Sequence, residues 1–258
     1  MKKQILLTSW ILLLLITGCQ PKQDDSTSTP TPVSSTQAEA TPEAGKSLAI
    51  NPNILLDPAV TDDTDSLLVS SYVYEGLVRL DTSGNIQPAL ASSWIVSDDQ
   101  LDYIFEIRSN AAFSDGTPIT TDIIVDNFNR WFDPQSPLHG DGNYPTWLEK
   151  FIAFNGERDA DDRAKSLVDG IQKVDINTVL IHLSRPVPEA EMLEYVAHPA
   201  FAILHPDSLS SSGYGTKDSD IISSGAYIVS SWDDSGLTLS PNPNYWNPVS
   251  ESIEFVWK

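Results

Sequence analysis

The strongest constraint on the fold is an abrupt change of composition near residue 46. Residues 20–46 are mostly Ser, Thr, Pro, Ala and acidic residues, with almost no large apolar side chain. Such a segment cannot bury enough apolar surface to offset the entropy lost on ordering. We therefore predict a flexible tether over residues 19–46, and any hydrophobic core must form from residues 47–258. That length allows one large domain or two small ones.

The N-terminus has the pattern of a targeting segment. Two lysines precede an apolar run over residues 5–16, which is shorter than the roughly 20 residues of a membrane-spanning helix. Residues 1–18 are thus predicted to be a signal peptide. The end of this run, Ile16-Thr17-Gly18-Cys19, resembles the lipobox of bacterial lipoproteins, which implies lipidation (diacylglyceryl and palmitate) of Cys19 and a stable membrane anchor. The alternative is an ordinary secretory signal with an incidental cysteine.

Charge and composition exclude several classes of function. The formal net charge is −21, with 15 basic and 36 acidic residues, so the surface repels nucleic acid and anionic lipid. A single cysteine allows no intramolecular disulfide, and the four histidines lack ligand spacing, so we expect no metal and no cofactor. There is no Gly-x-Ser-x-Gly motif and no phosphate-binding glycine loop, so we expect that the protein is not an enzyme.

Hydrophobic periodicity predicts a mixed α/β fold. Apolar residues alternate with mostly polar ones over 101–108, which is typical of a strand with one buried face. Strand pairs are expected at 94–97 with 101–108, at 171–174 with 178–183, and at 225–232 with 236–240. Further strands are expected at 47–50, 77–80, 201–204 and 252–257. Helices are expected at 66–75, 122–132, 146–154 and 189–196, with one helical turn within 88–93.

An extended stretch and an acidic corner precede the first expected helix. Pro58 disfavours a helical conformation at Asp57. Thr64 or Asp65 is expected to cap the free amides of a helix that starts at Ser66, and Gly76 is expected to end it.

Short motifs in a fixed order resemble a known family. They are Leu56-Asp57-Pro58-Ala59, Tyr74-Glu75-Gly76-Leu77, Pro88 to Trp94, Phe113 to Thr120, Val174 to Leu183, Arg185 to Pro188, and Asn242-Pro243-Asn244-Tyr245-Trp246. Together they resemble the family 5 extracellular solute-binding proteins, the peptide- and nickel-type receptors of bacterial ATP-driven importers. One departure is that the family's Gly-Thr-Gly-Pro-Tyr appears here as Ser223 to Tyr227.

The resemblance implies a type II periplasmic-binding-protein-like clamshell of mixed α/β architecture. The main lobe would comprise residues 47–74 and 198–258, and an inserted subdomain residues 75–197. Family members are about twice as long, so the second lobe is expected to be missing and the isolated chain to bind ligand weakly or not at all.

The implied function is the lipid-anchored substrate-binding component of an ABC importer. Such a monomer would capture a peptide or other small solute at the extracytoplasmic face of the cell envelope and pass it to membrane permease subunits. Two alternatives stay open: a truncated fragment that cannot bind, and a hydrolase lipoprotein at the cell surface.

The resemblance also implies two groups of ligand-binding residues. By position, Thr61, Asp62, Asp63, Thr64 and Asp65 border the cleft, although the same acids at a helix N-terminus could serve only to cap the helix. A calcium loop is disfavoured because the acids lack EF-hand spacing. Ser224, Gly225 and Tyr227 could line the cleft near the hinge, or they could form the start of a hairpin with a core tyrosine.

Overall fold

The computed structural model describes residues 47–209 and 213–258. The predicted signal peptide, the tether and Cys19 lie outside the described residues. The helices are α1 (Thr64–Val73), α2 (Thr121–Phe132), α3 (Pro145–Phe151), α4 (Glu189–Val196) and α5 (Pro206–Leu209), with 3-10 turns η1 (Pro58–Val60) and η2 (Pro199–Phe201). The strands are β1 (Ser47–Ile50), β2 (Val78–Leu80), β3 (Ile86–Pro88), β4 (Ala91–Val96), β5 (Asp102–Ile107), β6 (Val168–Lys173), β7 (Thr178–Leu183), β8 (Tyr227–Trp232), β9 (Gly236–Pro241) and β10 (Ile253–Trp257). Among these helices, none has the length and apolar character that crossing a membrane requires.

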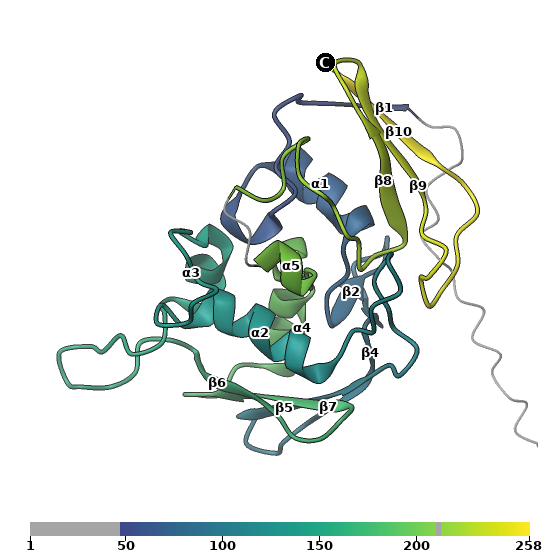
Figure 1. The fold of residues 1–258 in the computed structure, drawn as a ribbon. Helices are drawn as coiled ribbons and strands as arrows, with labels where there is room; N and C mark the ends of the chain where they lie inside the picture. Colours follow the sequence, from purple (N-terminus) through teal and green to yellow (C-terminus); the bar gives the residue numbers. More distant parts are fainter. Residues whose placement is uncertain (1–46, 210–212) are drawn as a thin grey trace, which may run out of the picture. The chain divides into compact units, whose positions relative to one another are not determined.

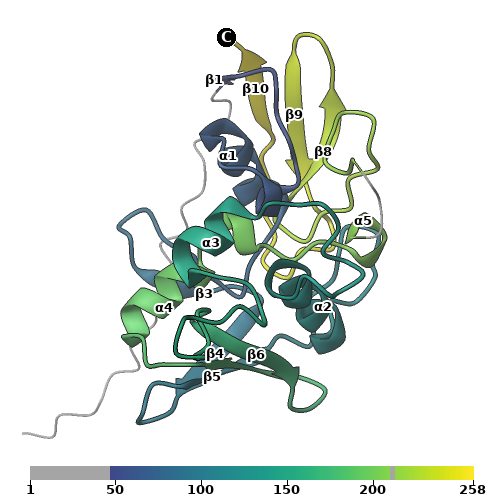
Figure 2. The ribbon, with the colours of Figure 1, turned by 90° about the vertical axis from the view of Figure 1, so that its left-hand side faces the viewer.

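One four-stranded sheet joins the first and last described strands. Its order is β1-β10-β9-β8, and β1 runs parallel to β10 while the other pairs are antiparallel (Figure 1). Helix α1 packs against one face of this sheet (Figure 2). The ring of Tyr72 on α1 contacts Tyr227 at 5.9 Å and Phe255 at 6.0 Å between centroids. The aromatic contacts therefore fix α1 on the sheet.

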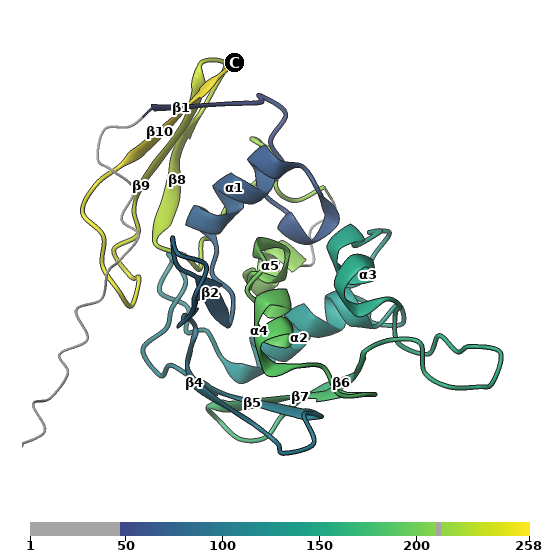
Figure 3. The same cartoon turned by 180° about the vertical axis from the view of Figure 1, so that it is seen from behind.

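A second four-stranded sheet is antiparallel throughout, in the order β4-β5-β7-β6. Tyr103 and Phe105 on β5 and Ile181 on β7 point inward and are fully buried. Helices α2 and α4 cover this inner face (Figure 3). On the other face Ile95 is 68% exposed. The period-2 pattern of 101–108 thus gives one buried and one open face, as expected.

Buried apolar side chains form two separate clusters. One draws on residues 50–74 and 202–255, and includes Val69, Val73, Leu204, Leu239 and Phe255. The other draws mostly on residues 77–203, and includes Phe105, Phe128, Trp131, Trp147 and Ile181. The assignment of residues 47–74 and 198–258 to a main lobe, and of 75–197 to an inserted subdomain, stays a prediction.

The predicted hairpins are confirmed as the pairs β4–β5, β6–β7 and β8–β9, and the predicted helix over 189–196 is α4. The helical turn expected within 88–93 is wrong. Pro88 pairs with Val78, and Ala91 pairs with Ile107, so these residues lie in strands β3 and β4. Ladder hydrogen bonds to neighbouring strands outweigh the local preference.

The strand expected at 201–204 is also wrong, although these residues are buried. The Ile203 amide donates to the Glu75 carbonyl at 2.9 Å. The side-chain amide of Asn127 bonds both the N–H and the C=O of Leu204, at 2.9 and 3.0 Å. Tertiary partners therefore satisfy the buried backbone groups that a sheet ladder would otherwise satisfy.

Candidate ligand-binding site

The ligand segment, which we define as Thr61–Asp65, enters helix α1 through an N-cap. The cap is Asp63, whose carboxylate accepts the Ser66 amide at 2.8 Å. The helix therefore begins at Thr64, and the expected cap at Thr64 or Asp65 is wrong. Thr61 supports the cap, because its hydroxyl accepts the Asp63 amide at 3.1 Å.

The far end of α1 also differs from expectation. The helix ends at Val73, not at Gly76, because Tyr74 is already extended. The hydroxyl of Tyr74 donates to the carbonyl of Leu56 at 3.1 Å. This buried contact turns the chain out of the helix before the glycine is reached.

Asp65 is held by residues outside the helix. Its carboxylate accepts the Asn51 amide at 2.8 Å and lies 3.3 Å from the Lys258 ammonium group. The pKa of Asp65 is lowered chiefly by the Asn51 hydrogen bond; burial opposes this shift, and Lys258 adds to the lowering. The carboxylate thus ties the start of α1 to the ends of β1 and β10.

Two residues of the ligand segment have side chains that are available to contact a ligand. Asp62 and Thr64 are exposed, and neither side chain forms a hydrogen bond or ion pair with any other part of the chain that the structure describes. The ligand segment therefore divides into a structural group (Thr61, Asp63 and Asp65) and an open group (Asp62 and Thr64).

The backbone before the ligand segment is fixed by a buried ion pair. The two terminal guanidinium nitrogens of Arg130 on α2 donate to the two carboxylate oxygens of Asp57, at 2.9 and 2.5 Å, and each side chain is 9% exposed. One turn, η1, follows Asp57, and the Val60 amide closes it on the Asp57 carbonyl at 3.2 Å. The ligand segment begins immediately after this turn.

The second group of predicted residues is buried. Ser224 is 1% exposed, and its hydroxyl donates to the Ile203 carbonyl at 2.6 Å and accepts the Glu75 amide at 3.0 Å. The Gly225 amide donates to the Val73 carbonyl at 2.9 Å. Tyr227 is 3% exposed in the core between α1 and β8.

The structure does not bring the two predicted groups together. Gly225 contacts the C-terminal end of α1, whereas Thr61–Asp65 lies at its N-terminal end. Ten helical residues at 1.5 Å each separate these ends by about 15 Å. A single small ligand would need to reach along the helix to contact both groups.

Sequence reasoning did not identify the environment of Glu75. Its carboxylate accepts hydrogen bonds from the Tyr245 hydroxyl and the Trp246 indole, both at 2.7 Å. Burial raises the pKa of Glu75 despite these bonds and the nearby Arg79 and Arg108. Both motifs, Tyr-Glu-Gly-Leu and Asn-Pro-Asn-Tyr-Trp, were visible, but nothing in the sequence indicated that they meet.

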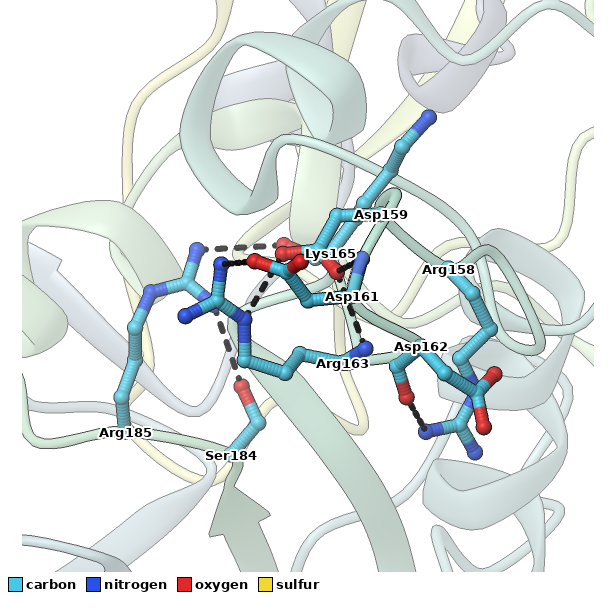
Figure 4. A network of polar contacts seen from close by, with 8 residues as sticks. All are labelled: Arg158, Asp159, Asp161, Asp162, Arg163, Lys165, Ser184 and Arg185. Atoms are coloured by element: carbon cyan, nitrogen blue, oxygen red, sulfur yellow. Dashed lines mark hydrogen bonds and ion pairs between the residues drawn. The ribbon is translucent and has the colours of Figure 1, made fainter.

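Other polar features lie away from the ligand segment. A hollow of about 230 Å³ lies over β9 and β10, and none of the eight predicted residues lines it. In the loop between α3 and β6, Asp159 accepts hydrogen bonds from the backbone amides of Asp161 and Arg163 and from the Arg163 side chain (Figure 4). Arg185, which follows β7, donates to the carbonyl of Lys165 in this loop. Among the described residues, no three His, Cys, Asp or Glu side chains are grouped so that they could hold a metal ion.

Comparison with known proteins identifies relatives. The family described as bacterial extracellular solute-binding proteins, family 5 Middle, matches residues 85–256. The periplasmic murein peptide-binding protein MppA of Escherichia coli K12 is 29% identical over 206 residues, which cover 78% of this chain and 36% of MppA. The probable D,D-dipeptide-binding periplasmic protein DdpA of the same organism is 32% identical over 200 residues, which cover 74% of this chain and 34% of DdpA. The chain thus spans about a third of the length of these relatives.

Solved structures agree with the sequence matches. OppA of Listeria monocytogenes, bound to peptide, superposes with a TM-score of 0.66 at 25% identity, over 82% of this chain and 41% of OppA. HbpA2 of Haemophilus parasuis superposes with a TM-score of 0.68 at 27% identity, over 82% and 42% of the two chains. The described residues have the expected mixed α/β fold of type II periplasmic binding proteins, over part of the length of those proteins.

Proposed function

Because the chain belongs to the bacterial extracellular solute-binding proteins of family 5, we propose that it is the substrate-binding component of an ABC importer. It would capture a small solute outside the cytoplasm and pass it to permease subunits in the membrane. The family match over residues 85–256 carries this proposal. Cys19 would carry the lipid that anchors the protein as a monomer at the extracytoplasmic face of the cell envelope.

A peptide is the solute that the relatives favour. MppA and DdpA are both described as binding peptides, and the OppA structure contains one. Relatives whose names state peptide binding also favour a receptor over a hydrolase for this chain. Differential affinity for open and closed states would couple capture to delivery.

The ligand would contact the ligand segment through its open group. Asp62 and Thr64 are exposed and unpaired within the described part of the chain, so they can bond a ligand without breaking a structural contact. Thr61, Asp63 and Asp65 would hold the backbone in place, and Ser224, Gly225 and Tyr227 would support α1 from its other end. A carboxylate at Asp62 suits a ligand ammonium group or amide.

The first prediction concerns Asp62→Ala. We expect the dissociation constant for peptide to rise about tenfold or more, because a hydrogen bond to a charged group is lost. The free energy of unfolding should change by less than about 0.5 kcal/mol, since Asp62 is exposed and unpaired among the described residues. Isothermal titration with a mixed pool of short peptides, together with urea denaturation, measures both quantities.

Two matched variants complete this experiment. Asp98→Ala removes the same charge from an exposed turn between β4 and β5, and controls for the effect of net charge. Asp63→Ala removes the N-cap and should lower the free energy of unfolding by about 0.5–2 kcal/mol. Equal affinity losses in Asp62→Ala and Asp98→Ala would refute a direct ligand contact, and no binding by the unsubstituted protein would favour the alternative of a fragment that cannot bind.

A further inference from the structure

A short strap, residues 213–215, lies across the backbone that leads into the ligand segment. Both of its glycines have positive φ, +74° at Gly213 and +92° at Gly215, a conformation that glycine adopts without strain. A Cβ atom at Gly215 would lie 2.5 Å from the Asp57 nitrogen and 2.6 Å from the Leu56 carbonyl carbon. The strap therefore touches the main chain of Leu56 and Asp57 directly, as the chain after α5 passes the stretch before α1 (Figure 1).

The tyrosine of the strap extends this contact through a hydroxyl relay. The Tyr74 hydroxyl donates its proton to the Leu56 carbonyl at 3.1 Å. The two phenol oxygens of Tyr74 and Tyr214 lie 2.6 Å apart. Because each phenol has one proton, Tyr214 must be the donor to Tyr74 in this arrangement. The relay runs from Tyr214 through Tyr74 to Leu56.

Both polar groups of the Leu56 backbone are consequently held by this assembly. Its amide donates to the Gly215 carbonyl at 2.7 Å, and its carbonyl accepts from Tyr74. Leu56 is fully buried. Burial raises the pKa of both phenols above the ordinary value of 10.0, so both hydroxyls are protonated at neutral pH with a wide margin.

A short and restrained piece of chain connects Leu56 to the ligand segment. The next residue, Asp57, is clamped by Arg130, and the single turn η1 leads directly to Thr61. A displacement at Leu56 is therefore transmitted along a short, hydrogen-bonded piece of chain to Asp62. Pre-organisation of this kind raises affinity by reducing the entropy lost on binding.

We propose that Tyr214 is a positioning residue, which fixes the ligand segment through Tyr74 and Leu56 without contacting the ligand. The inference rests on the proposed function of the ligand segment. The side chain of Tyr214 is mostly buried, and its hydroxyl points into the relay.

The test is Tyr214→Phe in the full 258-residue chain, which removes one hydroxyl and keeps the ring. Hydrogen exchange by NMR reports on the amides of Leu56, Val60 and Asp63, which are bonded in the native structure. Titration with the mixed peptide pool reports affinity. We expect faster exchange at these amides and a dissociation constant about two- to tenfold higher, the effect of one buried hydrogen bond.

The control is Tyr103→Phe. The Tyr103 hydroxyl is also buried and donates to the Val187 carbonyl at 2.8 Å, but it lies in the other core. We expect it to lower stability to a similar degree while exchange at the three amides and peptide affinity stay unchanged.

The outcomes separate this proposal from the proposed function. Faster exchange in Tyr214→Phe but not in Tyr103→Phe, with weaker peptide binding, supports the positioning role. Equal exchange at the three amides in the two variants overturns it. Absence of peptide binding by the unsubstituted chain favours the alternative of a fragment that cannot bind over the proposed function, while the exchange comparison still decides whether Tyr214 orders the segment.

Discussion

The Asp57–Arg130 pair is the most deeply buried charge pair among the described residues. Removing one member of such a pair is costly because the remaining charge stays in a poorly solvated site. The pair is also a long-range contact, since it joins the stretch before the ligand segment to helix α2, 73 residues later. Pro58 made a non-helical conformation of Asp57 predictable, but no local pattern identifies a partner so distant in sequence.

The prediction at this site is that Arg130→Met lowers the free energy of unfolding by about 3–5 kcal/mol. Urea denaturation followed by tryptophan fluorescence measures this change. Lys173→Met is the matched control, because Lys173 pairs with Asp122 at 2.6 Å on an exposed surface, where such pairs contribute about 0–1 kcal/mol. A loss in Arg130→Met no larger than in the control would show that the buried pair contributes little.

The capping residues of α1 illustrate the limit of residue-level prediction. Sequence reasoning recognised a cap in the acidic corner but placed it one or two residues late. Adjacent Asp and Thr residues have similar capping preferences. Asp63 is the cap because Thr61 holds its amide, and because Asp65 is occupied by Asn51 and Lys258.

At the scale of elements, the contact between α1 and the start of β8 depends on a residue without a side chain. A Cβ atom at Gly225 would lie 2.8 Å from the Tyr72 carbonyl oxygen and 2.8 Å from the Val73 carbonyl carbon. These are backbone atoms of a helix, so they cannot move aside as a flexible side chain would.

We therefore expect Gly225→Ala to destabilise the protein by about 1–3 kcal/mol, the usual effect of overpacking. Thermal denaturation monitored by circular dichroism measures the change. Gly170→Ala in β6 is the control, since a Cβ there meets no atom within 4 Å. Similar melting temperatures for the two variants would contradict close packing of α1 on β8.

Prediction of the elements succeeded where the signal is local. The alternation within 101–108 and the turn residues between strands are properties of short windows, and the hairpins followed from them. The prediction of a strand failed at 201–204. The apolar run there reflects burial, but the side chains of Asn127 and Ser224 form hydrogen bonds with the backbone of Leu204 and Ile203. An apolar run alone cannot reveal which partner satisfies the backbone.

At the scale of the whole described part, Glu75 connects the two cores. It lies between α1, which belongs to one core, and β2, whose Val78 belongs to the other. Tyr245 and Trp246 reach it from the loop between β9 and β10, and the Arg108 guanidinium stacks on the Trp246 ring at 3.8 Å.

The contribution of Glu75 to the stability of the folded protein should depend on pH. Burial raises the pKa of Glu75 in the folded protein above its ordinary value of 4.5. Over the pH range above that value, the folded state binds more protons than the unfolded state, so rising pH lowers stability. The contribution of Glu75 is thus fully present below pH 4.5 and declines as pH rises through the folded pKa.

The measurement compares the unsubstituted protein with Glu75→Gln, which does not titrate. The difference in free energy of unfolding between them should shift in favour of the glutamine variant as pH rises from about 4 towards neutrality. The other carboxylates cancel in this difference. A difference that is constant or moves the opposite way would disprove a raised pKa at Glu75.

The candidate site could be predicted only in part. The family resemblance placed the ligand segment before α1, and the exposure of Asp62 and Thr64 is compatible with a ligand contact. The distance between Thr61–Asp65 and Ser224–Tyr227, about a helix length, depends on how β8 packs against α1. This packing is a tertiary contact, and the residue pattern of neither segment alone predicts it.

The parallel pairing of β1 with β10 has a consequence for the time course of folding. Ser47 pairs with Glu254, so the first strand waits for a partner that is synthesised about 200 residues later. At typical ribosomal rates of about 5–20 residues per second, that delay is about 10–40 s. Contacts this distant also slow folding after synthesis. The sheet cannot close while the chain is still emerging, so its β1 edge forms only after residues 253–257 have been synthesised.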